Sequence, residues 1–429
     1  MLLTIDKLVY GGDGLSRLAA DENGPGKAVF VPFVLEGEKV EVALVEQKRS
    51  FARARVEKVV ESSQLRVDAI CPYFGRCGGC HYQHTGYQHQ LEIKTAILKE
   101  NLRRIGKIEL DSSSVLHFSH EWNYRNRTRL KVQSAPEFAV GYYKANSHEL
   151  LPIEQCPISS PLINQAIAAL WREGRDKNLG EEIQEVELSV NADDSQLLLE
   201  VYGNIKSRES KQLSDTLMST LPALSGITFF KASAPTHPGE LKKIESIGVA
   251  EITYKTRSAS YRVSAGSFFQ VNRYLIDVLT DIVTGGSMGE TALDLYAGVG
   301  LFTCVLAKNF AQVIGVESSP TSHSDLLYNS PANVKAVRST TEQFLQRSSA
   351  ALRPNLVVVD PPRNGLGETV VRSLAGLGAS RIVYVSCEPA TASRDLAGLL
   401  SSGYRIQQAH VVDLFPQTFH IETVWHLVR

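Results

Sequence analysis

Hydrophobic and polar residues alternate in short runs at the start of the chain. Residues 29–34, 38–44 and 54–60 all show this alternation, and a glutamate–glycine turn separates the first two runs. A period of two is the pattern of a half-buried strand, and several short strands joined by turn residues are typical of a small barrel. We therefore expect residues 1–60 to form a small β-barrel.

The pattern changes near residue 263. Short apolar runs now alternate with stretches of helical periodicity, and the runs lie at residues 292–296, 313–316, 356–359 and 381–386. Buried strands that alternate with helices indicate a mostly parallel, doubly wound α/β sheet with helices on both faces. The sequence thus predicts such a domain over residues 263–429. Residues 61–262 form a central α+β segment, with a helix near residues 87–105 that could pack on the C-terminal domain.

Composition narrows the class of protein. Of the 429 residues, 43% are hydrophobic and 21% are charged, and the formal net charge is -1, which excludes a disordered tail, a fibre and a wholly basic nucleic-acid coat. Charged residues interrupt the first 20 positions, and no run approaches the roughly 18 apolar residues that span a bilayer. Six cysteines are too few for a disulfide scaffold. We expect a cytoplasmic protein without a membrane span.

The cysteines are clustered, which points to a metal. Three fall within ten residues in a C-x5-C-x2-C spacing, and a fourth follows downstream before a proline: Cys71, Cys77, Cys80 and Cys156. Four thiolates suit zinc or a [4Fe–4S] cluster, and the spacing alone does not decide between them. His81 and His84 are rival ligands.

A stripe of basic residues follows the cysteines. Four of them occupy alternate positions, Arg125, Arg127, Arg129 and Lys131, so on a strand they would share one face. Such a face can follow the phosphates of RNA. The alternative is a solvated face that pairs with acidic side chains.

The C-terminal domain opens with a glycine turn. Residues 294–303 read Asp-Leu-Tyr-Ala-Gly-Val-Gly-Leu-Phe-Thr, and Glu317 ends the next apolar run. Glycines let the backbone approach a ligand at the carboxyl ends of strands, and an acidic residue about 20 positions on suits ribose hydroxyls. The third glycine of a dinucleotide fingerprint is missing, which disfavours a nicotinamide cofactor. Asp360, before two prolines, places another carboxylate at a strand end.

Two further residues could do chemistry. Cys387 follows an apolar run in the polar setting Ser-Cys-Glu-Pro, and a thiol there could be a nucleophile if its pKa is lowered. The alternative, a small buried hydrophobe, explains Cys304 better than Cys387. Glu422, in His-Ile-Glu-Thr-Val, could be a general base if it is partly desolvated, or a surface carboxylate.

These runs, together with Phe-Phe-Gln-Val-Asn at residues 268–272, resemble the RNA uracil-C5 methyltransferase family, which uses S-adenosylmethionine. The resemblance implies a Rossmann-like class I methyltransferase domain, and residues 1–60 resemble the TRAM barrel that precedes many of these enzymes. It implies that Cys387 is the nucleophile and Glu422 the base that removes the C5 proton. The residues implied to line the S-adenosylmethionine site are Gln270, Tyr296, Glu317, Asp360 and, more loosely, Ser339.

The resemblance also bears on the metal and the substrate. It implies a [4Fe–4S] cluster on the four cysteines, with a structural or RNA-positioning role. It favours ribosomal over transfer RNA, and we expect a monomer. Two departures from the family pattern are Glu388, where many members have asparagine, and Leu301, where many have a polar residue. The competing hypotheses are a non-catalytic RNA-binding iron–sulfur protein and a nicotinamide-linked oxidoreductase with an iron–sulfur centre.

Overall fold

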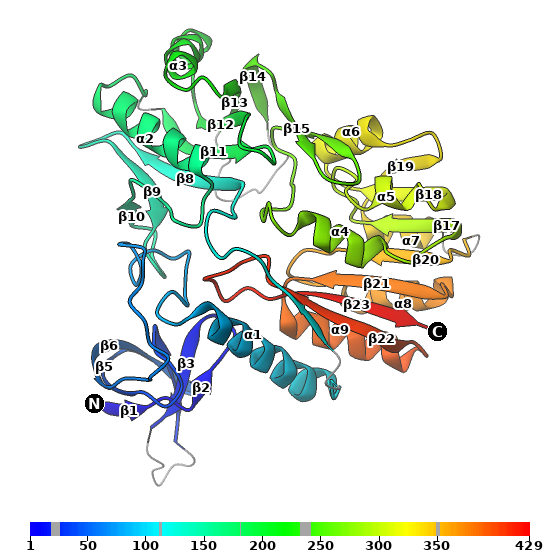
Figure 1. Cartoon of the computed structure of the whole chain (residues 1–429), viewed down its shortest axis with the longest axis horizontal. Helices are drawn as coiled ribbons and strands as arrows, with labels where there is room; N and C mark the ends of the chain where they lie inside the picture. Colours follow the sequence, from blue (N-terminus) through cyan, green and yellow to red (C-terminus); the bar gives the residue numbers. More distant parts are fainter. Residues whose placement is uncertain (19–25, 111–113, 181, 232–241, 349–351) are drawn as a thin grey trace.

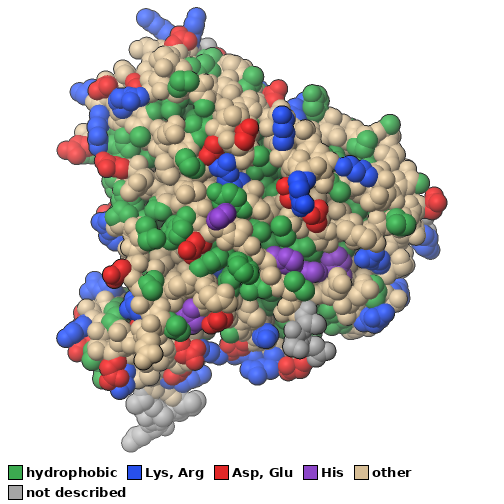
Figure 2. Space-filling model, in the orientation of Figure 1, with side chains coloured by type: hydrophobic (Ala, Val, Ile, Leu, Met, Phe, Trp, Pro, Cys, Tyr) green, Lys and Arg blue, Asp and Glu red, His purple; other side chains and the backbone are tan. Residues whose placement is uncertain are grey.

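The computed structural model describes residues 1–18, 26–110, 114–180, 182–231, 242–348 and 352–429. Three large sheets dominate it: an N-terminal sheet and a central sheet lie on the left in Figure 1, and the C-terminal sheet lies on the right. Basic and acidic side chains are interspersed over the face seen in Figure 2, in keeping with the near-zero net charge. Among the described helices, none is both long enough and apolar enough to cross a membrane.

The N-terminal sheet has six strands in the order β1-β5-β6-β4-β3-β2. The strands are β1 (Leu2–Thr4), β2 (Lys7–Leu8), β3 (Asp13–Arg17), β4 (Ala28–Pro32), β5 (Lys39–Gln47) and β6 (Phe51–Glu61). Alternate residues such as Val29, Val31, Val40 and Val42 are buried in its own core. The predicted strands near residues 29–34, 38–44 and 54–60 are therefore confirmed. Arg66, beyond the sheet, donates to the buried Glu38 carboxylate at 2.6 Å and ties the following segment to the sheet.

The segment after the N-terminal sheet leads to a long helix. Residues 62–86 contain no helix or named strand and carry the clustered cysteines. They are followed by α1 (Tyr87–Asn101) and the π-helical turn η1 (Leu102–Gly106), where one helix was predicted. The apolar face of α1, including Ile93, Ile97 and Leu98, belongs to the same core as the C-terminal sheet. Figure 1 shows α1 beside α9 (Pro389–Ser401).

The central sheet has seven strands in the order β10-β9-β8-β11-β12-β13-β14. Its strands are β8 (Arg127–Gln133), β9 (Ala139–Tyr143), β10 (Leu150–Pro152), β11 (Ile183–Val190), β12 (Leu197–Gly203), β13 (Leu224–Lys231) and β14 (Lys243–Gly248). The helices α2 (Pro161–Arg175) and α3 (Ser207–Thr220) pack on it and on each other. A hairpin of β15 (Glu251–Lys255) and β16 (Ser260–Ser264) leads to the C-terminal domain.

The basic stripe lies at β8, which pairs with the glutamate-bearing strand β11. Arg127 and Arg129 both donate to Glu187, and Lys131 donates to Glu185. These pairs neutralise the charges that were predicted to follow phosphates. The structure therefore favours the alternative, a face paired with acids, for three of the four residues. Only Arg125 lies outside this ladder of ion pairs.

The C-terminal sheet has eight strands in the order β19-β18-β17-β20-β21-β23-β22-β7. Its strands are β7 (Val115–His117), β17 (Gly289–Leu295), β18 (Phe310–Glu317), β19 (Val334–Arg338), β20 (Leu356–Val359), β21 (Arg381–Ser386), β22 (Arg405–Val412) and β23 (Glu422–Val428). Strands β17 to β21 are parallel to one another, and β23 is antiparallel to both of its neighbours, β21 and β22. The helices, besides α9, are α4 (Ile276–Thr284), α5 (Thr303–Leu306), α6 (Pro320–Asn329), α7 (Thr341–Ser348) and α8 (Gly367–Leu377).

Both faces of this sheet are buried. Leu293 and Leu295 of β17 belong to one apolar core, whereas Ala292, the residue before Leu293, belongs to another. Because successive side chains of a strand point to opposite faces, the two cores lie on opposite sides of the sheet. The predicted doubly wound α/β fold is confirmed. Its strand order reverses between β17 and β20, which is where open α/β sheets bind ligands.

Candidate active site

The glycine turn follows β17 at the carboxyl edge of the sheet. Tyr296 adopts a φ of 72°, and its N–H and that of Ala297 donate to the carbonyl of Val316 at 3.1 and 2.9 Å. A non-glycine residue in this conformation is strained, and such strain gathers at functional sites. Gly298 has a φ of 57°, and a Cβ there would meet nothing within 4 Å. The turn therefore presents bare backbone to open space, where a ligand can approach closely.

Glu317 ends β18 beside this turn. Its carboxylate accepts hydrogen bonds from the N–H of Gly298 at 2.9 Å and from the N–H of Ser319 at 2.6 Å. Ser339, directly after β19, donates its N–H to the Glu317 carbonyl at 3.1 Å. Glu317, Tyr296 and Ser339 thus lie at one edge of the sheet. The carboxylate retains free lone pairs that could accept from ribose hydroxyls.

Sequence reasoning missed Asp294, a fully buried carboxyl one strand position before the turn. Thr303 donates to its Oδ2 at 2.5 Å, and its Oδ1 has no hydrogen-bond partner among the residues that the structure describes. Burial raises the pKa of Asp294 to about 6. The sequence does contain a signal for Asp294. Burying a carboxylate in an apolar strand lowers stability unless a partner compensates it, so such a residue is a candidate for a functional role.

Cys387 and Glu422 lie next to each other at this edge. Ser386 of β21 pairs with Thr423 of β23, so one step further along the ladder Cys387 stands opposite Glu422. Strand alternation also places their side chains on one face, the face of Asp294 and Asp360. The sequence separates these four residues widely. The antiparallel β23 brings its first residue to the edge where the parallel strands end.

The electrostatics of the four groups follow from this proximity. Burial raises the pKa of Asp360 to about 7, and Asp294 adds to the effect. Burial, and then Asp360, raise the pKa of Glu422 well above its usual range. Burial, followed by Glu422 and Asp360, raises the pKa of the Cys387 thiol to about 12, and Arg363 opposes the rise. In this state the thiol is protonated at neutral pH, and the raised pKa values of Asp360 and Glu422 favour the neutral forms of these carboxyls.

The two departures from the family pattern have structural roles. Glu388 caps α9, and its carboxylate accepts the N–H of Thr391 at 2.7 Å. Leu301 is buried in an apolar core of the sheet. Gln270 lies on the segment after β16, where its carbonyl accepts from Asn126 at 2.9 Å. No described contact ties the Gln270 side chain to the glycine turn.

An aromatic wall borders Cys387, and its members were not predicted. The Tyr10 hydroxyl, from the N-terminal sheet, donates to the Cys387 carbonyl at 3.2 Å. Its ring meets that of Phe419 edge-on at 5.2 Å, and Phe419 also contacts the rings of His81 and His420 at 4.6 and 4.3 Å. The N-terminal sheet, the cysteine-bearing segment and the C-terminal domain therefore meet at this wall. Contacts between such distant segments leave no local signal in the sequence.

A groove runs from this wall along the N-terminal sheet. It encloses about 1050 Å³, and its lining includes Tyr10, Phe30, Phe33, Arg53, Arg55, His81 and Phe419. The Arg53 guanidinium lies 5.8 Å from the centre of the Phe30 ring. Aromatic faces combined with arginine suit unpaired nucleic-acid bases and their phosphates.

The four clustered cysteines line one cavity of about 360 Å³, together with Arg125, Tyr142 and other side chains. All four thiols are free, and burial raises the pKa of Cys77 to about 11. Among the described residues, no three His, Cys, Asp or Glu side chains stand in a geometry that would hold a single metal ion. The rival ligands His81 and His84 do not line this cavity. His81 packs on Phe419, and the His84 ring nitrogen Nε2 lies 3.2 Å from the Val34 carbonyl.

Arg363 provides a test of the charges around Cys387. Replacing it in Arg363→Gln removes the cation that lowers the thiol pKa, so the thiolate fraction at pH 8 should fall. We expect iodoacetamide to label Cys387 roughly three- to tenfold more slowly, as measured by mass spectrometry of the Cys387 peptide. Arg372→Gln, which removes an exposed arginine that pairs with Glu368 on α8, is the matched control. Equal rates for Arg363→Gln and the unmodified protein would contradict this account.

Known proteins resemble this chain over its whole length. The family model described as tRNA (Uracil-5-)-methyltransferase matches residues 86–429. An uncharacterized RNA methyltransferase of Aquifex aeolicus is 36% identical, with 98% of this chain and 97% of the relative covered. Another, of Caldanaerobacter subterraneus subsp. tengcongensis, is 32% identical, with 98% and 96% covered.

A solved structure shares the fold. The structure of Pyrococcus abyssi tRNA (uracil-54, C5)-methyltransferase in complex with S-adenosyl-L-homocysteine has a TM-score of 0.79 and 25% identity, with 100% of both chains covered. It supports S-adenosylmethionine as the methyl donor of this fold. With the family match over most of its length, the chain belongs to the tRNA (uracil-5-)-methyltransferase family of RNA methyltransferases.

Proposed function

We propose that this protein transfers a methyl group from S-adenosylmethionine to C5 of a uridine in RNA, through a covalent adduct between Cys387 and C6. The observation that carries the proposal is the register of β21 and β23, which sets Cys387 opposite Glu422. C5 of uracil is a poor nucleophile until C6 has been attacked, so the reaction needs both a nucleophile and a base. Family membership supports the same reaction.

The proposed steps use these two side chains in turn. The Cys387 thiolate adds to C6, and the electron pair of the C5–C6 bond moves into an enolate. C5 then takes the methyl group as the bond from the sulfonium sulfur to the methyl carbon breaks, which leaves S-adenosylhomocysteine. Glu422 removes the C5 proton, the C5–C6 double bond forms again, and the bond between C6 and Cys387 breaks. A methyl group has replaced the C5 hydrogen, and the thiolate is restored.

The raised pKa values suit these roles. A carboxylate whose pKa is raised by burial is a stronger base than a surface glutamate, so Glu422 is matched to the removal of a carbon-bound proton once it is ionised. The Cys387 thiol must lose its proton before it can attack, and a positively charged sulfonium near it would lower its pKa. Arg363 acts in the same direction. Binding of the methyl donor would thereby favour the nucleophilic form.

The residues that would hold S-adenosylmethionine lie around the glycine turn. When bound, this molecule supplies a methyl group activated by a positively charged sulfur. Glu317 would accept from its ribose hydroxyls, and Gly298 leaves room beside the backbone. Asp360 would face its charged end, and the orphaned Asp294 Oδ1 would gain a partner. We assign Tyr296, Gln270 and Ser339 to the same site.

The groove along the N-terminal sheet supports an unpaired RNA segment as substrate. A uracil must leave its stack to reach Cys387, which costs a few kcal/mol and favours loops or single strands. The Tyr10 to Phe419 wall joins the groove to Cys387, so a flanking strand could follow it. We propose that residues 1–60 are a TRAM-like RNA-binding unit. We propose ribosomal RNA as the substrate, and transfer RNA is the competing candidate.

We also propose that the cysteine cavity holds a [4Fe–4S] cluster. Four thiols line one cavity, and a four-iron cluster separates its ligating sulfurs more widely than a single ion does. Arg125 lines the same cavity, and no carboxylate of the described residues lies within ion-pair distance of its guanidinium. That half-buried cation would offset the negative charge of four thiolates. The role of the cluster would be to shape the RNA-binding region, because methyl transfer involves no net electron flow.

Replacing the two reacting side chains separates their roles. Cys387→Ala should abolish both methyl transfer and the covalent RNA adduct, because C6 is no longer attacked. Glu422→Gln should slow release of tritium from [5-³H]uridine RNA by about 10²- to 10⁴-fold while a methylated adduct accumulates, which a denaturing gel detects. Cys304→Ala, in the apolar core, should keep the activity. Full methyl transfer by Cys387→Ala would refute the mechanism.

The substrate can be identified directly. The purified protein should place 5-methyluridine in ribosomal RNA prepared from cells that lack its gene, as mapped by mass spectrometry of nuclease fragments. Transfer RNA from the same cells should stay unmodified. Methylation of transfer RNA alone would overturn the preference for ribosomal RNA and leave the uracil-C5 reaction intact.

The cluster has its own test. Protein purified without oxygen should contain about four irons and four sulfides per chain, measured by elemental and sulfide analysis. Cys80→Ser and Cys156→Ser should lose them, whereas His84→Ala and Cys304→Ser should retain them. Zinc without sulfide in the unmodified protein would contradict the cluster and favour a zinc site.

A further inference from the structure

Residues 413–421, here called the strap, join β22 to β23, and Glu422 follows directly as the first residue of β23. The strap contains no helix or strand, yet Asp413, Leu414, Gln417 and Ile421 are buried. Buried backbone without regular structure must find its hydrogen bonds elsewhere. Many of the strap's hydrogen bonds are made with α1 and with the two residues that follow Cys80.

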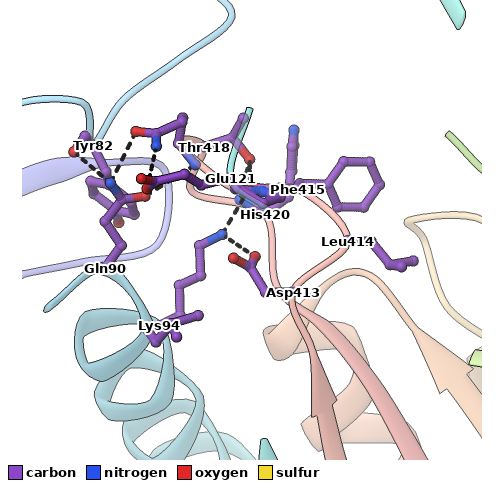
Figure 3. A network of polar contacts seen from close by, with 12 residues as sticks. Tyr82, Gln90, Lys94, Glu121, Asp413, Leu414, Phe415, Thr418 and His420 are labelled. Carbon is purple, nitrogen blue, oxygen red and sulfur yellow. Dashed lines mark hydrogen bonds and ion pairs between the residues drawn. The ribbon is translucent and has the colours of Figure 1, made fainter. Parts of the chain in front are cut away.

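One anchor is an ion pair at the start of the strap. Lys94 of α1 donates to the Asp413 carboxylate at 2.6 Å and to the Phe415 carbonyl at 2.9 Å, as Figure 3 shows. The side chains of Lys94 and Asp413 are 2% and 1% exposed. Tyr87 donates to the other Asp413 oxygen at 2.9 Å. A buried pair with all of these bonds tolerates little displacement, because loss of either partner leaves an unpaired charge.

The second anchor is a reciprocal pair of glutamines. Gln90 of α1 donates from Nε2 to the Gln417 side-chain oxygen at 2.9 Å, and its own Oε1 accepts the Gln417 N–H at 3.0 Å. Gln90 is 1% exposed, and its Nε2 also donates to the carbonyls of Tyr82 and Thr85. Figure 3 shows Gln90 reaching from α1 toward Tyr82 and Glu121. Gln90 thus joins the helix, the cysteine-bearing segment and the strap.

The same point of the strap is bound from the cysteine side. The N–H groups of His81 and Tyr82, directly after Cys80, both donate to the Gln417 carbonyl at 2.8 and 3.0 Å. Gln417 has a φ of 69°, a conformation that a residue with a side chain rarely adopts. Such strain persists where surrounding contacts over-determine it. The strap is therefore held in one shape by contacts concentrated at Gln417.

We propose that Gln90 and Gln417 are positioning residues that set Glu422 for removal of the C5 proton, and so connect the cysteine-bearing segment to the base. This inference rests on the proposed function. Cys387 follows β21, whose pairing with β20 does not involve the strap. Glu422 is the first residue after the strap. Phe419 and His420 lie near the end of the strap, just before Glu422 in the sequence. Loosening the strap should therefore leave the attack by Cys387 intact and slow the later proton transfer.

The experiment uses the full-length protein, its methylatable RNA and S-adenosylmethionine. Gln90→Ala and Gln417→Ala should each slow tritium release from [5-³H]uridine RNA about tenfold, while the methylated Cys387 adduct accumulates on a denaturing gel. The double variant should be slowed by clearly less than the product of the two single effects, since the two side chains share one hydrogen bond. Thr95→Ala, which removes a hydroxyl that donates to the Leu91 carbonyl within α1, is the matched control and should leave both readouts unchanged.

Each outcome decides the inference. Slower tritium release without adduct accumulation, or additive effects in the double variant, would show that the glutamines only support the fold. If Gln90→Ala fails to fold, Gln90→Glu keeps the acceptor for the Gln417 N–H and removes the donor, so the same comparison applies. Absence of any adduct in the unmodified protein would instead refute the proposed function, which separates the two failures.

Discussion

The antiparallel pairing of β21 with β23 is the constraint on which the candidate active site depends. In a purely parallel sheet, the start of a strand lies at the edge opposite the ends of its neighbours. Because β23 runs the other way, Glu422 at its start reaches the edge where β21 ends at Cys387. Thr423 donates to the Ser386 carbonyl at 3.1 Å, and the fully buried Trp425 donates to the Thr423 hydroxyl at 2.9 Å. A slip of one residue would turn Trp425 out of its core and Glu422 to the opposite face, so packing fixes the register.

The same register concentrates negative charge where it is costly. Asp294, Asp360 and Glu422 share a buried face with Cys387. Burial raises every pKa in the group, and neighbouring carboxylates add to each rise. A site arranged only for stability would avoid this arrangement, because buried carboxyls are retained at a cost unless a partner compensates them. A cationic ligand would relieve the repulsion and favour the thiolate in one step. The electrostatics thus fit a positively charged methyl donor better than a neutral or anionic cofactor.

Local periodicity was enough to predict the strands of the C-terminal sheet, because residues such as 313–316 and 356–359 are apolar on both faces and lie between polar turns. The glycine turn and the strand-end Glu317 could be found for the same reason. Alternation alone could not distinguish a phosphate-binding stripe from an ion-paired ladder, since that depends on Glu187 across the sheet. Tyr10, Gln90 and Phe419 gave no signal, because their partners lie hundreds of residues away in the sequence.

Those long-range contacts bring the three parts of the chain together around one candidate site. Phe419 contacts Tyr10 of the N-terminal sheet and His81 of the cysteine-bearing segment, and the strap that carries it is fixed by α1. A change in the cysteine cavity that moved Cys80 would displace His81 and Tyr82, which hold the strained Gln417. If RNA binds in the groove as proposed, its displacement would act on the same strap through Tyr10 and Phe419. Under the proposed function, a cluster in the cysteine cavity and RNA in the groove would both act on Glu422 through the strap. A closely packed strap would transmit such shifts because it has little room to absorb them.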